Sequence, residues 1–416
     1  MKIGICFPFK INFRTIFIGC SLFFGLSAQG QTLQTLIDVA IKNSPEIKKF
    51  ELRYKLTSEK VNETHWIPNT EVSAGYFVSE PETRVGAQRA RFSVKQMLPW
   101  FGTITARENY VSSMADADYV EVTIAKRQLA LSFSQYYYQL YEIEAKQRVL
   151  DSNVALLKTY ERLALTSVEV GKASAVDLLR LQIRQNELDQ EKEILTQQFK
   201  AVRATLNSLL NREVTLDVMA VDSLVLPAED IDFSLEEFSL NPEVLKYDKL
   251  YESVVQAEML NQREALPMLG LGLDYIPVSE RTDMSMIDNG KDIVMPMVSL
   301  SIPIFNHRYQ SISRQNELQQ QEILSQKEER LNGLQSDLAK AVSLRNQARI
   351  QFSTQQKNIE QAKDAEEILI KNYETGTIDF NDLLDIQELQ LKFQMNQIAA
   401  IKAYYAQSAL INYVIK

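Results

Sequence analysis

The chain has 416 residues, of which 45% are hydrophobic and 24% are charged, and it contains only 13 glycines and 11 prolines. This composition is typical of an ordered, mainly helical protein. The formal net charge of −9 argues against nucleic acid as a partner, because nucleic acids are bound through basic surfaces.

Residues 1–30 have the pattern of a secretory signal peptide. Three basic residues and no acidic residue occur in this segment, whose apolar run Thr15–Leu26 is followed by small residues. Cleavage before Gln31 would leave 42 Lys and Arg (45 − 3) against 54 Asp and Glu, a formal charge of 42 − 54 = −12. The sequence therefore predicts an exported, acidic protein.

Both cysteines, Cys6 and Cys20, lie in this leader. The exported chain is therefore expected to have neither a disulfide nor a thiolate metal site, and its stability must come from packing. Phe17–Cys20 loosely resembles a lipoprotein cleavage box. This leaves two interpretations of Cys20, a lipidated residue or a cysteine in a discarded leader.

The segment from Thr32 to about His65 has the periodicity of amphipathic helices. Ser44-Pro45 predicts the start of a second helix within it, since serine caps helices and proline suits their first turn. Asn241-Pro242 repeats this start 241 − 44 = 197 positions later. The residues expected on one face of the first helix are Leu33, Leu36, Val39 and Ala40.

Two stretches, 69–98 and 267–302, change to a period of two and are predicted to be β-hairpins with polar loops. Apolar residues alternate with small or polar ones along each strand; Val72, Ala74 and Tyr76, for example, alternate with Ser73 and Gly75. Strands of about ten residues match the length of a tilted transmembrane strand.

A soluble hairpin with one face on a core is the alternative interpretation of these strands. The leader, the absence of an apolar run of about 18 residues after it, and the small or polar character of every second residue favour the membrane. A closed barrel needs at least about eight strands, and the chain offers four, so several copies must pool their hairpins. Pro296 is expected near the beginning of its strand, because proline removes a ladder donor.

Long segments with apolar residues at alternating spacings of three and four predict coiled-coil helices. A helix of about 65 residues reaches about 100 Å, a length that bridges a space rather than enclosing a pocket. The expected seam residues are Val122, Leu129, Phe133, Tyr136, Leu140, Ile143, Leu150, Val154 and Leu157, then Leu178, Leu181, Leu188, Leu195, Phe199, Val202, Leu206 and Leu209, and in the second half Leu324, Leu331, Leu334, Leu338, Phe352, Ile359, Ala362, Leu369, Tyr373, Leu383, Ile386, Phe393, Ile398 and Tyr405.

The pattern G-x5-D-L-L-x-x-Q occurs twice, at Gly171–Gln182 and at Gly376–Gln387, 376 − 171 = 205 positions apart. Each copy predicts the tip of a helical hairpin, where glycine ends one helix and a capped helix begins. The residues expected to form the capping boxes are Ser174 with Asp177 and Asp379 with Asp382.

The two tips and the two proline starts define an internal twofold repeat. We expect a first unit over residues 31–212, with its hairpin tip at 166–177, and a second unit over 235–416, with its tip at 373–382. Residues 213–234, which include Pro227 and several acids, are predicted to connect them.

This order of elements resembles the TolC family of outer-membrane efflux proteins across essentially the whole exported chain. The residues that carry the resemblance are Gln96–Gly102, Ile302–Asn306 and Tyr373–Asp385. The Leu98-Pro99-Trp100-Phe101-Gly102 form is most similar to the heavy-metal efflux branch.

The resemblance implies a mainly α fold with a small membrane β part. Long helical hairpins would form an α-barrel that extends into the periplasm, and four strands from each chain of a homotrimer would form a twelve-stranded outer-membrane β-barrel. It also implies contact with outer-membrane lipid, a periplasmic adaptor protein, and an inner-membrane pump of the RND type. The expected function is the passive exit duct of a tripartite efflux pump, with heavy-metal cations as one cargo class.

Two alternatives stay open, the outer-membrane component of a type I secretion system and a periplasmic coiled-coil scaffold whose hairpins never insert. An enzyme is not expected, and no cofactor or confident metal site is predicted. The two histidines, His65 and His307, lie in different segments, and no nucleotide-binding glycine loop or HExxH pattern occurs.

The second tip carries Asp382 and Asp385 on one helical face, at positions i and i+3. In the TolC family the matching acids line the closed periplasmic mouth as cation-binding rings, and Tyr373 is grouped with them here. An ordinary solvated tip is the alternative. Arg180, the counterpart of Asp385 in the first copy, is predicted to pair with it across a helix interface. Ile378 stands where some relatives have a basic latch residue, so the latch chemistry stays open.

The tips are also the predicted adaptor contact, because they end the longest elements. The residues concerned are Gly171, Lys172, Ala173 and Ser174 in the first tip and Gly376, Thr377, Ile378 and Asp379 in the second. Four methionines in the second hairpin are spaced as on one face, and thioethers suit Cu(I) or Ag(I). Ordinary surface methionine is the simpler interpretation of Met284, Met286, Met295 and Met297.

Overall fold

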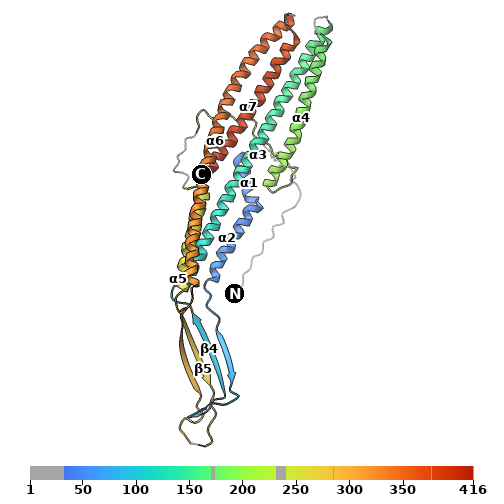
Figure 1. Cartoon of the computed structure of the whole chain (residues 1–416). Coiled ribbons are helices and arrows are strands. Elements are labelled where there is room, and N and C mark those ends of the chain that lie inside the picture. Colours follow the sequence, from blue (N-terminus) through green and yellow to red (C-terminus); the bar gives the residue numbers. More distant parts are fainter. Residues whose placement is uncertain (1–31, 170–173, 231–239, 284, 376, 416) are drawn as a thin grey trace, which may run out of the picture.

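The computed structural model describes residues 32–169, 174–230, 240–283, 285–375 and 377–415. The molecule is elongated, with a β-sheet at one end and the tips of two helical hairpins at the other (Figure 1). The signal peptide with both cysteines, Gly171, Lys172, Ala173, Gly376 and Met284 lie outside the described residues.

Seven helices and six strands occur in the part of the chain that the structure describes. The helices are α1 (Leu33–Asn43), α2 (Pro45–Glu63), α3 (Thr103–Glu169), α4 (Ala175–Leu209), α5 (Pro242–Glu264), α6 (Arg308–Thr375) and α7 (Phe380–Ile415). The strands are β1 (Glu71–Tyr76), β2 (Glu82–Thr83), β3 (Gly86–Ala87), β4 (Ala90–Leu98), β5 (Met268–Ile276) and β6 (Ile293–Ser301). No helix within the described ranges has both the length and the apolar character that a membrane crossing needs.

The duplicated helix start is confirmed. The side chain of Ser44 accepts a hydrogen bond from the main-chain N of Ile47 at 3.3 Å, and that of Asn241 accepts one from Glu243 at 2.8 Å. A proline follows each cap, in the first turn of α2 and of α5. These local signals are sufficient to start a helix, because they supply an acceptor for the free N–H groups of the first turn.

The predicted face of α1 is partly wrong. Leu36 and Ala40 are buried, but Val39 is 43% exposed and Ile37 takes its place in the core. Leu36, Ile37 and Ala40 lie within one sector of a helix with 3.6 residues per turn, and Val39 lies outside that sector.

The two longest helices, α3 with 67 residues and α6 with 68, run the length of the helical part. Each packs against two shorter helices in succession: α2 and then α4 along α3, and α5 and then α7 along α6. Each predicted long hairpin therefore has one continuous arm and one arm built from two helices. The repeats join where α3 packs against α5 near the sheet and against α7 towards the tips.

Most predicted seam residues are buried or half-buried. One core cluster includes Phe133, Leu140, Leu150 and Leu157 of α3, and a second includes Leu334 and Leu338 of α6. Two positions are wrong. Tyr136 is 37% exposed while Tyr137 is 1% exposed, and Leu324 is 52% exposed while Ile323 is 6% exposed. A straight helix of this length drifts relative to a strict seven-residue repeat, so a seam extrapolated from the sequence slips to a neighbouring position.

The four longer strands form one antiparallel sheet in the order β1-β4-β5-β6. The central pair, β4 with β5, joins the two repeats, and Val94 lies opposite Leu273 there. β2 and β3 form a separate small ladder. Pro296 is not at the beginning of β6 but is its fourth residue, opposite Leu273. Within one chain β6 is an edge strand, where a missing donor interrupts few ladder bonds.

The described part of the predicted connector is anchored to the helices. Val218 and Ala220 are buried in the core cluster. The phenol oxygens of Tyr137 and Tyr141 accept hydrogen bonds from main-chain N atoms of this segment, from Val221 at 3.0 Å and from Leu224 at 3.3 Å. The connector therefore packs as part of the fold.

Asp230, at the end of this described part, ties the connector to α6 and α7. Its carboxylate accepts hydrogen bonds from Arg349 at 2.6 Å and Tyr404 at 2.5 Å, and Arg345 lies 3.7 Å away. Burial alone would raise the pKa of Asp230, but these hydrogen bonds and the charge of Arg345 outweigh it and hold the pKa below its ordinary value of 3.8.

A folded-state pKa below the unfolded one means that ionised Asp230 stabilises the fold above the unfolded pKa, and that this contribution is lost as the pH falls through the folded pKa. Asp230→Asn is expected to lower the free energy of unfolding at pH 7 by about 1–2 kcal/mol. The difference from wild type should close in the acid range, as measured by thermal unfolding followed by circular dichroism. Asp217→Asn, whose side chain is 85% exposed, is the matched control. A constant difference at every pH would contradict the expectation.

Candidate functional site

The register of the sheet assigns each strand residue to one of two faces, because successive side chains alternate. One face is apolar in all four strands except at Gln96. Its members are Val72, Ala74, Tyr76, Ala90, Phe92, Val94, Gln96, Leu98, Leu269, Leu271, Leu273, Tyr275, Val294, Pro296, Val298 and Leu300.

This apolar face is open in the single chain. Val72 and Val298 are each 75% exposed, Tyr76 is 72% exposed, and Phe92 and Leu273 are about half exposed. The exception, Gln96, uses its amide within the structure, since its Oε1 accepts from Thr70 and its Nε2 donates to the carbonyl of Pro68 at 2.6 Å. A continuous apolar surface of this size is not stable in water and requires an apolar cover.

The opposite face carries mainly small, polar and charged side chains, together with four methionines and two isoleucines. Its members are Glu71, Ser73, Gly75, Arg91, Ser93, Lys95, Met97, Met268, Gly270, Gly272, Asp274, Ile276, Ile293, Met295, Met297, Ser299 and Ser301. Asp274 is fully buried and forms an ion pair with Arg91 of the neighbouring strand. A sheet with one apolar and one polar face fits a wall between lipid and water.

Glycine at position 270 lets side chains of both neighbouring strands cross over β5. A Cβ there would clash with Ser299 Oγ and would lie 2.7 Å from Met97 Sδ. The space above Gly270 on this face is therefore occupied by the side chains of Ser299 and Met97 from the two neighbouring strands. Met295 and Met297 lie on this face as predicted. No group of three or more His, Cys, Asp or Glu residues that could hold a metal ion occurs in the described ranges, and His65 and His307 are exposed at separate junctions.

The first tip has the predicted capping box. Ser174 Oγ accepts a hydrogen bond from the main-chain N of Val176 at 3.2 Å, and the main-chain N of Ser174 donates to Asp177 Oδ2 at 3.0 Å. Asp177 is only 8% exposed. The role of Asp177 in this turn is therefore structural, since its carboxylate accepts the hydrogen bond that starts α4.

The second tip differs from the first. Asp379 caps α7, since its carboxylate accepts hydrogen bonds from the main chain and the side chain of Asn381 at 3.3 and 3.2 Å. The second hydrogen bond of the predicted capping box, from the main-chain N–H of Asp379 to the carboxylate of Asp382, is not formed among the described residues. The main-chain N of Asp382 instead donates to the Asp379 carbonyl at 3.3 Å. Thr377 closes the end of α6 by donating from N and Oγ1 to the carbonyl of Asn372.

The structure brings some of the predicted gate residues together and not others. Asp382 and Asp385 are exposed on one face of α7. Arg180 reaches the second tip from α4, but within this chain its guanidinium donates to Asn381 rather than to Asp385. Tyr373 is 8% exposed, and its ring packs against that of Phe380 with the ring centres 5.3 Å apart and the planes tilted by 55°. Tyr373 is thus a core residue of the tip, and Asn381 and Phe380 are contacts that sequence analysis missed.

A buried polar cluster lies below the tips, where α3 meets α6 and α7. Gln387 Nε2 donates to Asn153 Oδ1 at 2.7 Å, Gln390 Nε2 donates to Glu366 Oε2 at 2.7 Å, and Tyr160 donates to Glu366. Gln387 closes the second copy of the repeated motif and is fully buried, whereas its counterpart Gln182 in the first copy is exposed. Gln387 Oε1 has no hydrogen-bond donor among the described residues. The hydrogen bonds that the cluster does form are specific to one alignment of the two helical hairpins.

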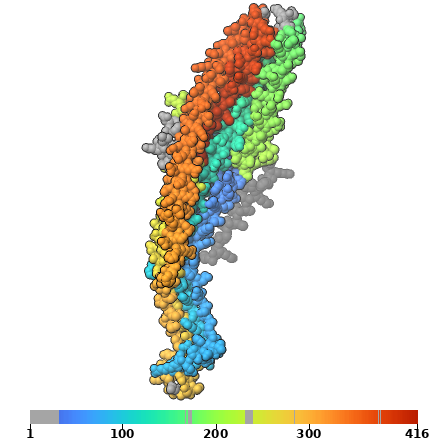
Figure 2. All heavy atoms as spheres, viewed as in Figure 1, coloured from blue at the N-terminus to red at the C-terminus, as the bar shows by residue number. Residues whose placement is uncertain are grey.

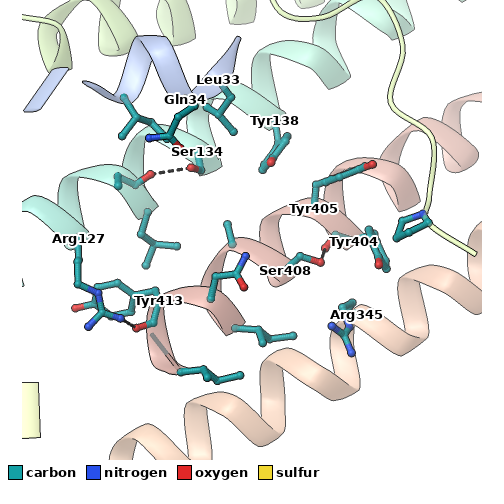
Figure 3. Close-up of a pocket in the computed structure, with 18 of the residues that line it drawn as sticks. Leu33, Gln34, Arg127, Ser134, Tyr138, Arg345, Tyr404, Tyr405, Ser408 and Tyr413 are labelled. Atoms are coloured by element: carbon teal, nitrogen blue, oxygen red, sulfur yellow. Dashed lines mark hydrogen bonds between the residues drawn. The ribbon is translucent and has the colours of Figure 1, made fainter. Parts of the chain in front are cut away.

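A cavity of about 630 Å³ lies between α1, α3, α6 and α7 (Figure 3). The guanidinium of Arg127 stacks on the ring of Tyr413 at 5.1 Å and donates to the Tyr413 carbonyl. Burial, with the neighbouring Tyr405 and Tyr137, raises the pKa of Tyr138 to about 12. Because most of the lining residues come from α1 and α3 of the first repeat and from α6 and α7 of the second, the cavity lies at the junction of the two repeats. Sequence periodicity gave no signal for it.

These elements define a class of fold, that of outer-membrane channel proteins in which a small sheet continues into long helical hairpins. The predicted resemblance to the TolC family is confirmed at the level of the fold.

Three solved structures illustrate the likeness. The outer-membrane protein VceC from Vibrio cholerae matches with a TM-score of 0.71 at 14% identity, over 92% of this chain and 95% of that chain. CusC matches with a TM-score of 0.75 at 14% identity, over 93% of this chain and 92% of that chain. The open state of the Neisseria gonorrhoeae MtrE outer-membrane channel matches with a TM-score of 0.73 at 14% identity, over 92% of this chain and 89% of that chain. No protein-family model and no curated protein matches the sequence.

Proposed function

We propose that this protein is the outer-membrane exit duct of a tripartite efflux pump and acts as a homotrimer. The observation that carries the proposal is the two-faced four-stranded sheet, whose edge strands β1 and β6 each have one edge unpaired within the described part of one chain. Unpaired edges are not tolerated in lipid, so each β6 must pair with the β1 of another copy. Three copies give twelve strands, which exceeds the minimum of about eight for a closed barrel.

The helices have matching edges. Figure 2 shows α6 along one long edge of the molecule and α4 along the opposite edge near the tips. Both edges expose apolar side chains, Val176, Leu179, Ile183 and Ile194 on α4 and Leu318, Leu324, Leu344, Ile350 and Ile368 on α6. A contact between two different edges is head-to-tail, and such contacts close into rings. The ring would continue the β-barrel as a helical tube through the periplasm.

Single-channel recording tests this proposal. The purified protein should run as a heat-modifiable, detergent-resistant trimer and should produce discrete current steps in planar lipid bilayers. A scaffold whose hairpins never insert predicts a protein that leaves bilayers silent. A sample that stays monomeric in mild detergent and gives no current would refute the proposal that the protein is an exit duct.

The acids of the second tip are proposed to form the periplasmic gate. Asp382 and Asp385 are exposed on one side of α7 near its start. Threefold symmetry would bring three copies of each around the axis, where crowded negative charge attracts cations. Arg180 and Asn381 hold α4 against the same turn, and a contact of Arg180 with Asp385 of a neighbouring copy stays part of the proposal.

Asp382→Ala/Asp385→Ala is expected to weaken the block of conductance by divalent cations, because the block needs the combined charge of the rings. Planar-bilayer conductance with and without Mg²⁺ measures this effect. Asp364→Ala, on the exposed side of α6 farther from the tip, is the matched control. Equal block of conductance in wild type and the double variant would refute the gate and favour the alternative, an ordinary solvated tip.

The described tip residues Ser174, Thr377, Ile378 and Asp379 are proposed to contact a periplasmic adaptor, because they end the molecule opposite the sheet. Among them Ser174, Thr377 and Asp379 are exposed. An inner-membrane pump of the RND type would complete the assembly, and an ABC exporter of a type I secretion system is the second candidate. Heavy-metal cations are proposed as one cargo because CusC is among the similar folds. Growth of a deletion strain on copper, silver, zinc and antibiotic plates tests the cargo.

A further inference from the structure

The end of the sheet nearest the helices exposes a band of large apolar side chains. Trp66 is 55% exposed, Trp100 36%, Phe101 81%, Ile304 72% and Phe305 94%. They lie in the three junctions between α2 and β1, β4 and α3, and β6 and α6. Trp100 and Phe101 follow directly after β4, and Ile304 and Phe305 follow shortly after β6, so they continue from the ends of strands that carry Leu98 and Leu300 on the apolar face. Aromatic residues at the end of an apolar barrel face mark the level of the lipid headgroups.

A cationic side chain lies at the same level. The guanidinium of Arg107, on the second turn of α3, sits over the ring of Trp66 at 4.4 Å. Its Nε and Nη2 donate to Glu264 Oε1 at the end of α5, at 3.3 and 3.2 Å. Its Nη1 is buried and has no hydrogen-bond acceptor among the described residues. A guanidinium group that keeps one unused donor is expected to bind a further acceptor.

A second arginine flanks the same corner. Arg263 is exposed at the end of α5, and its guanidinium carbon lies 3.7 Å from the position of a Cβ at Gly102, whose φ of +83° forms the bend into α3. Glu264 forms its ion pair with Arg107, and the exposed Arg263 forms no ion pair with any residue that the structure describes. Arg263 therefore leaves a positive charge in the corner that no neighbouring carboxylate neutralises. The sheet supplies an apolar surface directly beside it.

We infer that Arg107, Arg263 and Trp66 form a binding site for the phosphate diester of a phospholipid in the periplasmic leaflet. Guanidinium groups bind phosphate oxygens through parallel N–H donors. The acyl chains would lie on the apolar face below the aromatic band, and the phosphate would accept hydrogen bonds from the exposed guanidinium of Arg263. It would also accept from Nη1 of Arg107, whose side chain is 16% exposed, once that side chain turns the buried N–H outward. This inference rests on the proposed membrane insertion and adds to it a specific lipid contact at each subunit.

Native mass spectrometry of the full-length protein in detergent tests the site with three probes. Dioleoylphosphatidylglycerol should form adducts that survive gas-phase activation, and dioleoylglycerol, which lacks the phosphate, should not. Inorganic phosphate at the same concentration should neither bind nor displace the lipid. Equal retention of dioleoylglycerol would show that the apolar band alone holds lipid, and displacement by inorganic phosphate would show a free-anion site. Either outcome overturns the inference.

Arg107→Gln/Arg263→Gln should weaken phosphatidylglycerol binding by about tenfold or more, because two charge-assisted contacts are lost. Arg314→Gln, which removes a cation whose side chain is 63% exposed on α6, is the matched control and should bind as wild type does. Arg107→Lys keeps the charge but not the planar donors, and it should bind with intermediate strength. Unchanged binding in the double variant would also overturn the inference.

Conductance of the same samples separates the two proposals. A wild-type protein that conducts but shows no preference for phosphatidylglycerol refutes the lipid site and leaves the duct intact. A protein that forms no channel refutes the duct itself. Double-variant protein that keeps its trimer and its current steps while losing lipid shows that the loss is not caused by misfolding.

Discussion

Val298→Arg is expected to destabilise the assembled protein by about 2–4 kcal/mol, the cost of placing a cation on the lipid face of a barrel at mid-depth. Val298 is the sixth residue of β6, lies opposite Leu271 on the apolar face, and is 75% exposed in one chain. The arginine side chain at this position would place its positive charge in the lipid that is proposed to cover this face. The yield of detergent-resistant trimer in the outer-membrane fraction, and its melting temperature, measure the effect.

Met295→Arg is the matched control in the same strand. Met295 lies on the polar face opposite Asp274, where an added cation has a carboxylate and water as neighbours. It should assemble as wild type does. If both variants assemble equally well, or if Met295→Arg is the more damaging one, the assignment of the two faces to lipid and water is wrong.

Tyr137→Ala is expected to lower the free energy of unfolding by about 3–5 kcal/mol, the usual cost of removing a buried aromatic side chain. Tyr137 is 1% exposed, and its phenol oxygen accepts a hydrogen bond from the main-chain N of Val221 in the connector. The substitution would therefore leave a cavity in the core and an unpaired donor in the connector. Thermal unfolding in detergent, followed by circular dichroism, gives the difference.

Tyr136→Ala provides the comparison, because Tyr136 is the adjacent residue and is 37% exposed. Its effect should stay within about 1 kcal/mol, as for most exposed substitutions. Tyr137→Phe, which keeps the ring and removes only the hydroxyl, should cost about 1 kcal/mol. A larger loss for Tyr136→Ala than for Tyr137→Ala would mean that the seam follows the heptad of the sequence after all.

Several features of the fold follow from short stretches of sequence. Ser44-Pro45 and Asn241-Pro242 start α2 and α5, and Ser174 with Asp177 starts α4, because the donors and acceptors involved lie within four residues of each other. The period of two in the hairpins gave the two faces of the sheet for the same reason. A side chain's face in a strand depends only on its position along that strand.

The contents of the tip were less predictable. The sequence indicated Asp382 and Asp385 as a pair on one face, and both lie exposed on α7. It did not indicate that the ring of Tyr373 packs against that of Phe380 or that Arg180 donates to Asn381. Arg180 and Asn381 are 201 positions apart, and no local pattern specifies which of several polar side chains a long arginine will reach.

The amino-acid sequence by itself determined the repeat, the starts of the capped helices, and the alternation of the strands, since each depends on interactions between residues close together in the chain. Only the tertiary structure decided which residues of α3 form the core, how β4 pairs with β5, and that Gln387 is buried beside Asn153 while Gln182 is exposed. These features depend on how two helical hairpins pack along their whole length. Small departures from an ideal repeat accumulate over such a length, so they are fixed by the packing of distant segments.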